Sequence, residues 1–373
     1  MKTYRSQLIK EKDETTGVEV VRLSDDVGDT IHPYFTQPLF SSDGKILLVE
    51  SDRTGFWQLY SLEVDTGLVT QLTEESGIEP HRSCLDPERL VAYYFSGRIL
   101  KSVELSTLRT EEIYVVPEGF CPSIPSLSAD GLYLAFSYSE RLHLSVRDWM
   151  WEHLYRRPRS MVIRVDLESG MAEALWGECE WISHVNISPV DADIVLFCHE
   201  GPWELVQRMW VVKASTHEVW PLVKQKRYLQ ACGHEFFTRD GKVVTQYAER
   251  DRADRNEWRR FNLIVNPDGE ELGKFRYPGM WPTHIQANSS ATLFVGDAAY
   301  PTADFTEGAY FIGLVRHVQD RAEVELLCRH DSSWQSQEAH PHPVFTPDDR
   351  HVIFTSDRGG RCNVYMVKVG ERE

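Results

Sequence analysis

The stretch "FSSDGKILLVESDRTGFWQLYSLEVDTG", Phe40 to Gly67, has the pattern of consecutive short β-strands. The segments ILLVES and WQLYSLEV are rich in β-branched and aromatic residues, and each follows a turn that contains Asp and Gly. This combination predicts antiparallel strands joined by tight turns. The same pattern returns as "FTPDDRHVIFTSDRGGRCNVYMVKVG", Phe345 to Gly370, so the chain is expected to be built from repeats.

Seven repeats of this kind can be aligned. Their strongest strand segments begin at residues 45, 89, 132, 193, 242, 292 and 350. A shorter strand precedes each of them and carries an apolar residue at a fixed place: Phe40, Cys84, Leu127, Ile187, Phe237, Ala287 and Phe345. A third strand follows in every repeat, and a fourth follows in the first six. The fourth strand of the last repeat can be supplied by residues 17–26, GVEVVRLSDD.

Seven four-stranded units whose chain ends pair in one unit predict an all-β fold, a seven-bladed β-propeller. We expect one domain over residues 1–373, with its last blade closed by the N-terminal strand. The segment 139–160 alone has helical character, and it falls between the second and third strands of repeat three. It is therefore expected to be a helical insertion.

Composition excludes several classes of function. The formal net charge of −17 argues against a nucleic-acid partner, which would require a concentrated basic surface. No uncharged apolar stretch is long enough to cross a membrane, and the charged N-terminus does not fit a secretory signal. The seven cysteines are scattered without a CxxC spacing, so reduced thiols are expected. We expect a soluble, cytoplasmic protein without a membrane partner, and its oligomeric state stays open.

A column of histidines follows from the repeat alignment. The residues three positions before the fixed apolar residue are Gln37, His81, Ile124, His184, His234, His284 and His342. In a propeller the first strand of each blade lines the central channel, so these positions would face one another. A single histidine there would usually be solvated, but five of the chain's 14 histidines share this one position.

Two further candidate ligands stand beside the last histidine, in "QSQEAHPHPVF", Gln335 to Phe345. These are Gln337 and His340. Neutral imidazoles that converge with an amide oxygen suit a borderline divalent ion such as Mn²⁺, Fe²⁺ or Zn²⁺. The two prolines give a rigid backbone and are tolerated where little ladder pairing is lost.

Loops between second and third strands should lie at the same face as the histidine column. In repeat four this loop reads CHEGPWELVQRMW and contains His199, Glu200 and Arg208. Equivalent loops in other repeats contain Arg53, Arg252, Arg255 and Arg358. Any one of these arginines could simply form a surface ion pair. Together they could provide the local positive field that an acidic protein needs to hold an anionic ligand.

The sequence resembles the oligogalacturonate lyases of polysaccharide lyase family 22, and its repeats resemble those of TolB-type propellers. The resemblance covers nearly the whole chain and is carried by HPYFTQPLFSSDGK, FCHEGPWELVQRMW, GHEFFTRDG, THIQANSSATLFVGD and QEAHPHPVF.

The resemblance implies a lyase that cleaves short galacturonides, typically digalacturonate, by β-elimination in intracellular pectin breakdown. It implies that Mn²⁺, or another divalent cation, is bound by His284, Gln337, His340 and His342. His234 would be the Brønsted base that removes the C5 proton, and Arg208 would lie beside the reacting sugar.

Four further residues are candidates to contact the substrate, and two other functions stay open. The candidates are His81, His184, His199 and Arg53. A non-catalytic propeller could bind a partner through its channel face, although it would have no need of a histidine column. A lyase for another uronate-containing oligosaccharide could use the same residues.

Overall fold

The computed structural model describes residues 2–145, 148–254, 257–278, 282–297 and 310–370. The chain divides into two compact units. The first unit comprises residues 1–96, 102–111 and 278–373, and the second comprises residues 97–101 and 112–277. Nearly all regular structure is β-strand, so the all-β prediction is confirmed. No helix in the described part of the chain is long and apolar enough to cross a membrane.

The first unit contains antiparallel sheets from both ends of the chain. One sheet has the order β1 (Thr3–Arg5), β7 (Leu68–Gln71), β6 (Gln58–Glu63), β5 (Ile46–Ser51) and β4 (Thr30–Ile31). Another has the order β2 (Ile9–Lys12), β3 (Glu19–Arg22), β31 (Asn363–Lys368), β30 (His351–Ser356) and β29 (Val344–Phe345). The remaining strands are the pair β8 (Ile78–Asp86) and β9 (Val91–Ser96), and the series β25 (Ile285–Ala287), β26 (Phe294–Asp297), β27 (Phe311–Val318) and β28 (Arg321–Arg329).

The second unit contains three antiparallel series. The first series is β12 (Phe120–Pro122), β14 (Tyr133–Glu140), β15 (Ser160–Asp166) and β16 (Ala172–Glu178), and β13 (Ser126–Leu127) also pairs with β14. The second is β17 (Ile182–Ile187), β18 (Ile194–His199), β19 (Met209–Lys213) and β20 (Glu218–Pro221). The third is β21 (Gln230–Phe237), β22 (Val243–Glu249), β23 (Arg259–Val265) and β24 (Glu271–Arg276). Strands β10 (Ile99–Glu104) and β11 (Thr110–Val115) have residues in both units.

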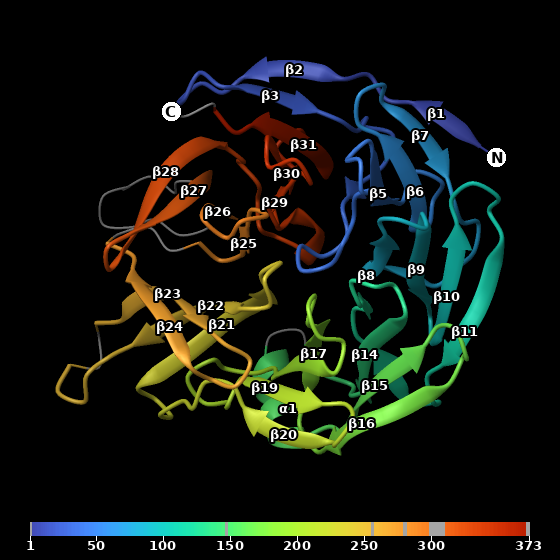
Figure 1. Ribbon diagram of the computed structural model, residues 1–373. Helices are drawn as coiled ribbons and strands as arrows, with labels where there is room; N and C mark the ends of the chain where they lie inside the picture. Colours follow the sequence, from blue (N-terminus) through green and yellow to red (C-terminus); the bar gives the residue numbers. More distant parts are fainter. Residues whose placement is uncertain (1, 146–147, 255–256, 279–281, 298–309, 371–373) are drawn as a thin grey trace. The chain divides into compact units, whose positions relative to one another are not determined.

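The pairing of the two chain ends is confirmed. Strand β3 pairs antiparallel with β31, and Val20 lies opposite Val367. Figure 1 shows these strands side by side although they come from opposite ends of the sequence. The N-terminal strand therefore completes the last repeat, as its sequence predicts.

The expected strands and insertion are also found. All seven strand segments that define the repeats form strands: β5, β9, β14, β18, β22, β26 and β30. The insertion of repeat three contains helix α1 (Trp149–Arg156), which lies between β14 and β15 in the sequence. A short 3₁₀ turn, η1 (Gln337–Ala339), precedes the His-Pro-His-Pro segment.

A recurrent turn explains why the first and second strands of a repeat form hairpins. In repeat one the Ser41 hydroxyl donates to Asp43 Oδ1 (2.7 Å), and Gly44 has φ +72°. Asp and Gly suit such turns because the carboxylate bonds nearby backbone and glycine accepts positive φ. The same hydroxyl-to-aspartate bond occurs at three other turns: Ser128 to Asp130, Thr238 to Asp240 and Thr346 to Asp348.

Apolar side chains pack neighbouring sheets together inside each unit. In the first unit, Val295, Ile312 and Phe354 belong to one buried cluster formed by β26, β27 and β30. In the second unit, Leu196 and Val243 belong to a cluster formed by β18 and β22. Burial of each such side chain contributes about 1.5–3 kcal/mol, so these contacts hold the neighbouring strands, and the residues they carry, in fixed positions.

Candidate metal centre and catalytic residues

Three histidines of the first unit come together. His284 precedes β25, His342 precedes β29, and His340 follows η1. Each offers a ring nitrogen, and these nitrogens all lie within 4.8 Å of one another. The ring centroids of His284 and His342 are 4.2 Å apart. The structure thus brings together three of the four metal ligands that the sequence analysis proposes.

The state of these imidazoles fits a bound cation. Both ring nitrogens of His342 and Nδ1 of His340 are buried and have no hydrogen-bond partner among the described residues. Burial lowers the pKa of His340 to about 4 and that of His342 well below its usual value. The rings are therefore neutral at neutral pH, which is the form that coordinates a metal. Buried imidazoles without a partner are costly unless something binds them.

The fourth expected ligand, Gln337, lies in η1 and its side chain is exposed. Its backbone carbonyl accepts a hydrogen bond from His340 N–H (3.2 Å), which holds the turn next to the histidines. Its role as a ligand stays a prediction.

Asp297, at the end of β26, holds this cluster in place. Its carboxylate lies 2.8 Å from His284 Nδ1 and also accepts the backbone N–H groups of His284 (2.8 Å) and His342 (3.3 Å). An imidazole whose Nδ1–H is bound by a carboxylate offers its Nε2 as the ligand, which is a common arrangement behind metal-binding histidines. Burial raises the pKa of Asp297 to about 6.

The sequence analysis missed Asp297, although a signal existed. Asp297 and Glu50 occupy the same place in the second strands of repeats six and one, where other repeats carry Tyr94, Ser137, Cys198, Tyr247 and Thr355. Both acids are 0% exposed. An acidic residue at a position that is buried in every repeat indicates a specific partner.

His81 lies against the cluster, and Glu50 supports it. The ring centroids of His81 and His342 are 5.1 Å apart. Burial lowers the pKa of His81 to about 3, against a smaller opposing effect of the Gln337 backbone. Glu50 accepts the His81 backbone N–H (2.6 Å) and the Ser83 hydroxyl (2.5 Å), while burial raises the pKa of Glu50 to about 7.

Three histidines of the expected column share a strained backbone. His81, His184 and His342 have φ of +64°, +48° and +47°. Side chains other than glycine rarely adopt this region, and such strain is often found at functional sites. The register also shifts near the column, between Ile78 and Ser83, between Ser183 and Asn186, and between Cys232 and Glu235. The irregularity thus recurs at the position that the repeat alignment identifies.

In the second unit, Arg208 is the centre of an ion-pair network. Its side chain is 1% exposed. Nε donates to Glu235 Oε2 (2.9 Å) and to the Gly233 carbonyl (3.0 Å), and Nη1 donates to Glu200 Oε2 (3.1 Å). Burial alone would raise the pKa of Glu200 and Glu235, but the adjacent Arg208 guanidinium keeps both pKa values below the usual range. Both carboxylates are therefore ionised.

His184 and His234 lie beside this network. His184 Nε2 is 3.2 Å from Glu200 Oε1, and its Nδ1 is 3.2 Å from Glu235 Oε1. The His184 ring stacks on that of His234, with centroids 5.7 Å apart. Trp203 stands perpendicular to His234 at 5.5 Å and also contacts the Arg208 guanidinium, at 5.7 Å. The predicted base and the predicted arginine therefore belong to one cluster.

Comparison with known proteins identifies the family. The sequence model of the family described as oligogalacturonate lyase matches residues 3–372. This chain belongs to that family. It is 32% identical to oligogalacturonate lyase from Dickeya dadantii, with 96% of this chain and 95% of the relative aligned. Oligogalacturonide lyase from Pectobacterium atrosepticum gives the same identity and coverage. The chain is accordingly an enzyme of the lyase class.

Solved structures agree with this assignment. A structure of oligogalacturonate lyase in complex with manganese superposes with a TM-score of 0.87 at 28% identity, covering 99% of this chain and 98% of the other. Oligogalacturonate lyase from Vibrio parahaemolyticus superposes with a TM-score of 0.86 at 29% identity and the same coverage.

The other candidate residues of this family member have partners elsewhere. His199 Nε2 bonds Glu178 Oε1 (2.7 Å). Arg53 pairs with Asp25 (3.0 Å) and lies over the Tyr4 ring at 4.2 Å. Substrate contact by His199 and Arg53 stays a prediction.

The structure describes two of the three remaining loop arginines. Arg358 pairs with Glu11 (3.0 Å) and stacks on Tyr365 at 4.1 Å. Arg252 is exposed, and Arg255 lies outside the described residues.

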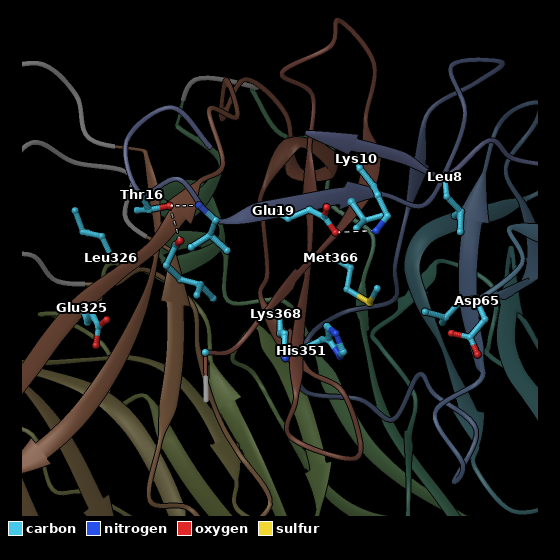
Figure 2. Close-up of a pocket in the computed structure, with 15 residues that line it drawn as sticks. Leu8, Lys10, Thr16, Glu19, Asp65, Glu325, Leu326, His351, Met366 and Lys368 are labelled. Atoms are coloured by element: carbon cyan, nitrogen blue, oxygen red, sulfur yellow. Dashed lines mark hydrogen bonds and ion pairs between the residues drawn. The ribbon is translucent and has the colours of Figure 1, made fainter. Parts of the chain in front are cut away.

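A cavity of about 760 Å³ opens in the first unit and is lined by none of the predicted site residues. Figure 2 shows side chains that line it: Lys10 and Glu19 form an ion pair (2.9 Å), and Asp65, His351 and Lys368 are further polar members of the lining. Its charges are mixed, so it gives no clear indication of a ligand.

Proposed function

We propose that this protein is a divalent-cation-dependent lyase that cleaves short oligogalacturonates, such as digalacturonate, by β-elimination. The observation that carries the proposal is the group formed by His284, His340 and His342, whose ring nitrogens converge within 4.8 Å in a member of the oligogalacturonate lyase family. Manganese is the preferred ion, because a solved relative is a complex with manganese.

The reaction removes the proton from C5, breaks the bond between C4 and the bridging oxygen, and forms a C4=C5 double bond; the departing oxygen takes up a proton. C5 lies next to a carboxylate, so deprotonation builds further negative charge on an anionic group. A divalent cation bound to that carboxylate would act as a Lewis acid and spread this charge. His284, Gln337, His340 and His342 would hold the cation, and Asp297 would keep His284 in the required orientation.

His234 is proposed as the base, and Arg208 as the donor that stabilises developing charge. A neutral imidazole can accept a proton near pH 7, and a positioned base contributes about 10²–10⁴-fold. Arg208 keeps a permanent charge in an environment that excludes water, where a donor acts more strongly than in solvent. The stacked His184 ring and the perpendicular Trp203 ring restrict the orientation of His234.

The propeller architecture, the substrate-contacting residues and the cellular location are part of the same proposal. We propose that the seven repeats form one seven-bladed propeller domain, in which His81, His184, His199 and Arg53 contact the substrate. The substrate would be a small anionic oligosaccharide met in the cytoplasm, without a nucleic-acid or membrane partner. The strongly acidic chain supports the exclusion of nucleic acid.

A product assay tests the proposal directly. Chelator-treated protein is incubated with digalacturonate, with and without Mn²⁺, and the unsaturated product is followed by ultraviolet absorbance and mass. Cleavage that requires the ion is expected. Absence of cleavage with every divalent ion tried would remove the assignment, and selective cleavage of a glucuronate-containing oligosaccharide would change the substrate class.

A further inference from the structure

We infer that Glu235 is a positioning residue, which fixes Arg208 so that a single guanidinium nitrogen, Nη2, is the donor offered to an anionic ligand. The inference deepens the proposed function, because the ligand would be the uronate substrate. The network itself lies entirely within the second unit.

The hydrogen bonds of Arg208 carry the first step. Nε and Nη1 are occupied by Glu235, Gly233 and Glu200. Nη2 is buried and has no partner in the described part of the chain. Its two N–H groups would lose free energy if they stayed unsatisfied, so this side of the guanidinium suits an acceptor that arrives with a ligand. An arginine fixed in this way contributes one nitrogen to the ligand, whereas the usual fork contributes two.

The two acids that hold Arg208 differ in what else they contact. The Glu235 side chain is 0% exposed, while that of Glu200 is 11% exposed. Glu235 uses Oε2 for Arg208, and its Oε1 lies 3.2 Å from His184, the ring that stacks on the proposed base His234. Glu235 is also the direct sequence neighbour of His234. One carboxylate therefore links the arginine to the imidazole pair.

The local backbone explains how Glu235 reaches this position. The register of β21 shifts between Cys232 and Glu235, and such a bulge redirects the side chains of its strand. Gly233 lies inside the bulge, and a Cβ there would come within 2.7 Å of the Trp203 ring and 2.8 Å of Gln246 Oε1. Glycine thus leaves room for Trp203 against Arg208, while its carbonyl accepts from Nε.

The charges of the network also favour a fixed Arg208. Glu200 and Glu235 provide two negative charges to Arg208 and the adjacent His184, inside a buried site where an uncompensated charge would be costly. Among the described residues, loss of the Glu235 charge leaves Arg208 with Glu200 as its one charged partner. The guanidinium would then turn, and Nη2 would lose its fixed direction.

The test compares Glu235→Gln with Glu249→Gln. Glu249 is a matched control because it lies on the adjacent strand β22 and pairs with Lys274 (2.7 Å), and none of the contacts described above involves it. The expected result is a 10–100-fold loss of kcat/KM for digalacturonate in Glu235→Gln, the range typical of residues that orient a functional group. Metal content should stay unchanged, and the control should keep its kcat/KM within about twofold of the parent.

A second measurement separates this inference from the proposed function. In ¹⁵N-arginine-labelled, metal-free protein, the Arg208 Nε–H signal should exchange slowly in the parent and in Glu249→Gln, but should broaden or average in Glu235→Gln. This readout requires neither substrate nor cation. An unchanged Arg208 signal in Glu235→Gln would overturn the inference even if activity fell. Failure of the parent to cleave any oligogalacturonate would instead count against the proposed function.

A conservative variant covers the case in which Glu235→Gln does not fold. Glu235→Asp keeps the charge but withdraws the carboxylate by one methylene group. It should fold, keep bound metal, and have a lower kcat/KM than the parent. Parental kcat/KM in Glu235→Asp, together with a parental Arg208 signal, would contradict a role that depends on position.

Discussion

The histidine cluster of the first unit and the arginine network of the second unit differ in the charge and hydrogen bonding of their buried polar groups. His340 and His342 are neutral, largely buried and short of hydrogen-bond partners. Arg208, in contrast, is fully charged and held by Glu200 and Glu235. Unsatisfied imidazoles indicate a site completed by a cation, whereas an internally neutralised network indicates a group oriented in advance for its ligand. The difference supports the proposed division, in which one cluster binds the cation and the other supplies the base and the charge stabilisation.

The largest catalytic effect is expected at His234. His234→Ala should lower kcat by about 10²–10⁴-fold while metal content and thermal stability stay near parental values, because the base is lost but the histidine cluster is untouched. Steady-state kinetics and elemental analysis measure both quantities. His217→Ala is a suitable control, since His217 is an exposed histidine of the same unit. Near-parental turnover in His234→Ala would assign the base elsewhere.

A smaller loss is expected for Arg208→Lys, about 100-fold in kcat/KM. The ammonium group cannot contact Glu200, Glu235 and the Gly233 carbonyl and still present a donor in the direction of Nη2. Urea unfolding should show a loss of about 1–3 kcal/mol, since a buried acceptor loses its partner. Unchanged kinetics with reduced stability would make Arg208 purely structural and would end the contrast between the two clusters.

Asp297→Asn should weaken Mn²⁺ binding by about 10-fold. The two carboxylate oxygens of Asp297 accept the backbone N–H groups of His284 and His342 and contact the His284 ring. Asparagine has the same size but only one oxygen, so it cannot accept all of these hydrogen bonds. Isothermal titration of the metal-free protein gives the affinity. If the affinity stayed parental, Asp297 would have no part in orienting the cluster.

The smallest effect is a pH dependence of stability from Glu50. Burial raises its pKa from 4.5 to about 7, so the folded state holds a proton that the unfolded state releases. The stabilisation is present below pH 4.5 and is lost as the pH rises through about 7, with a slope of about 1.4 kcal/mol per pH unit for one proton. Urea unfolding of metal-free parent and Glu50→Gln across this range should show a shallower decline in the variant. Parallel curves would remove Glu50 as the source.

Local sequence was sufficient to predict the second strand of all seven repeats. The turn that contains Ser41, Asp43 and Gly44 depends on local sequence alone, so its recurrence locates the hairpin in four of the repeats without knowledge of distant contacts. The proximity of His284 and His342 was also predictable. The alignment of the repeats places both residues at the same position relative to the first strand of their repeats. Both successes rest on periodicity.

The contacts that tune the clusters were not predictable in the same way. Asp297 and Glu235 acquire their partners only through tertiary packing and a strand bulge. The loop position of Arg208 left a surface ion pair open, and packing instead buries its side chain between Glu200 and Glu235. The role of such side chains depends on contacts between residues of different repeats. An alignment that compares single repeats contains no information on these contacts.

The central claim is that the cation binds at the histidine cluster of the first unit, although His184, Cys198 and Glu200 of the second unit also offer three ligand atoms within 4.8 Å of one another. Titration of Mn²⁺, followed by electron paramagnetic resonance of the free ion, tests this claim most directly in the parent, His342→Ala and His184→Ala. The account predicts one bound ion in the parent and in His184→Ala, and loss of binding in His342→Ala. Retained binding in His342→Ala with loss in His184→Ala would contradict it.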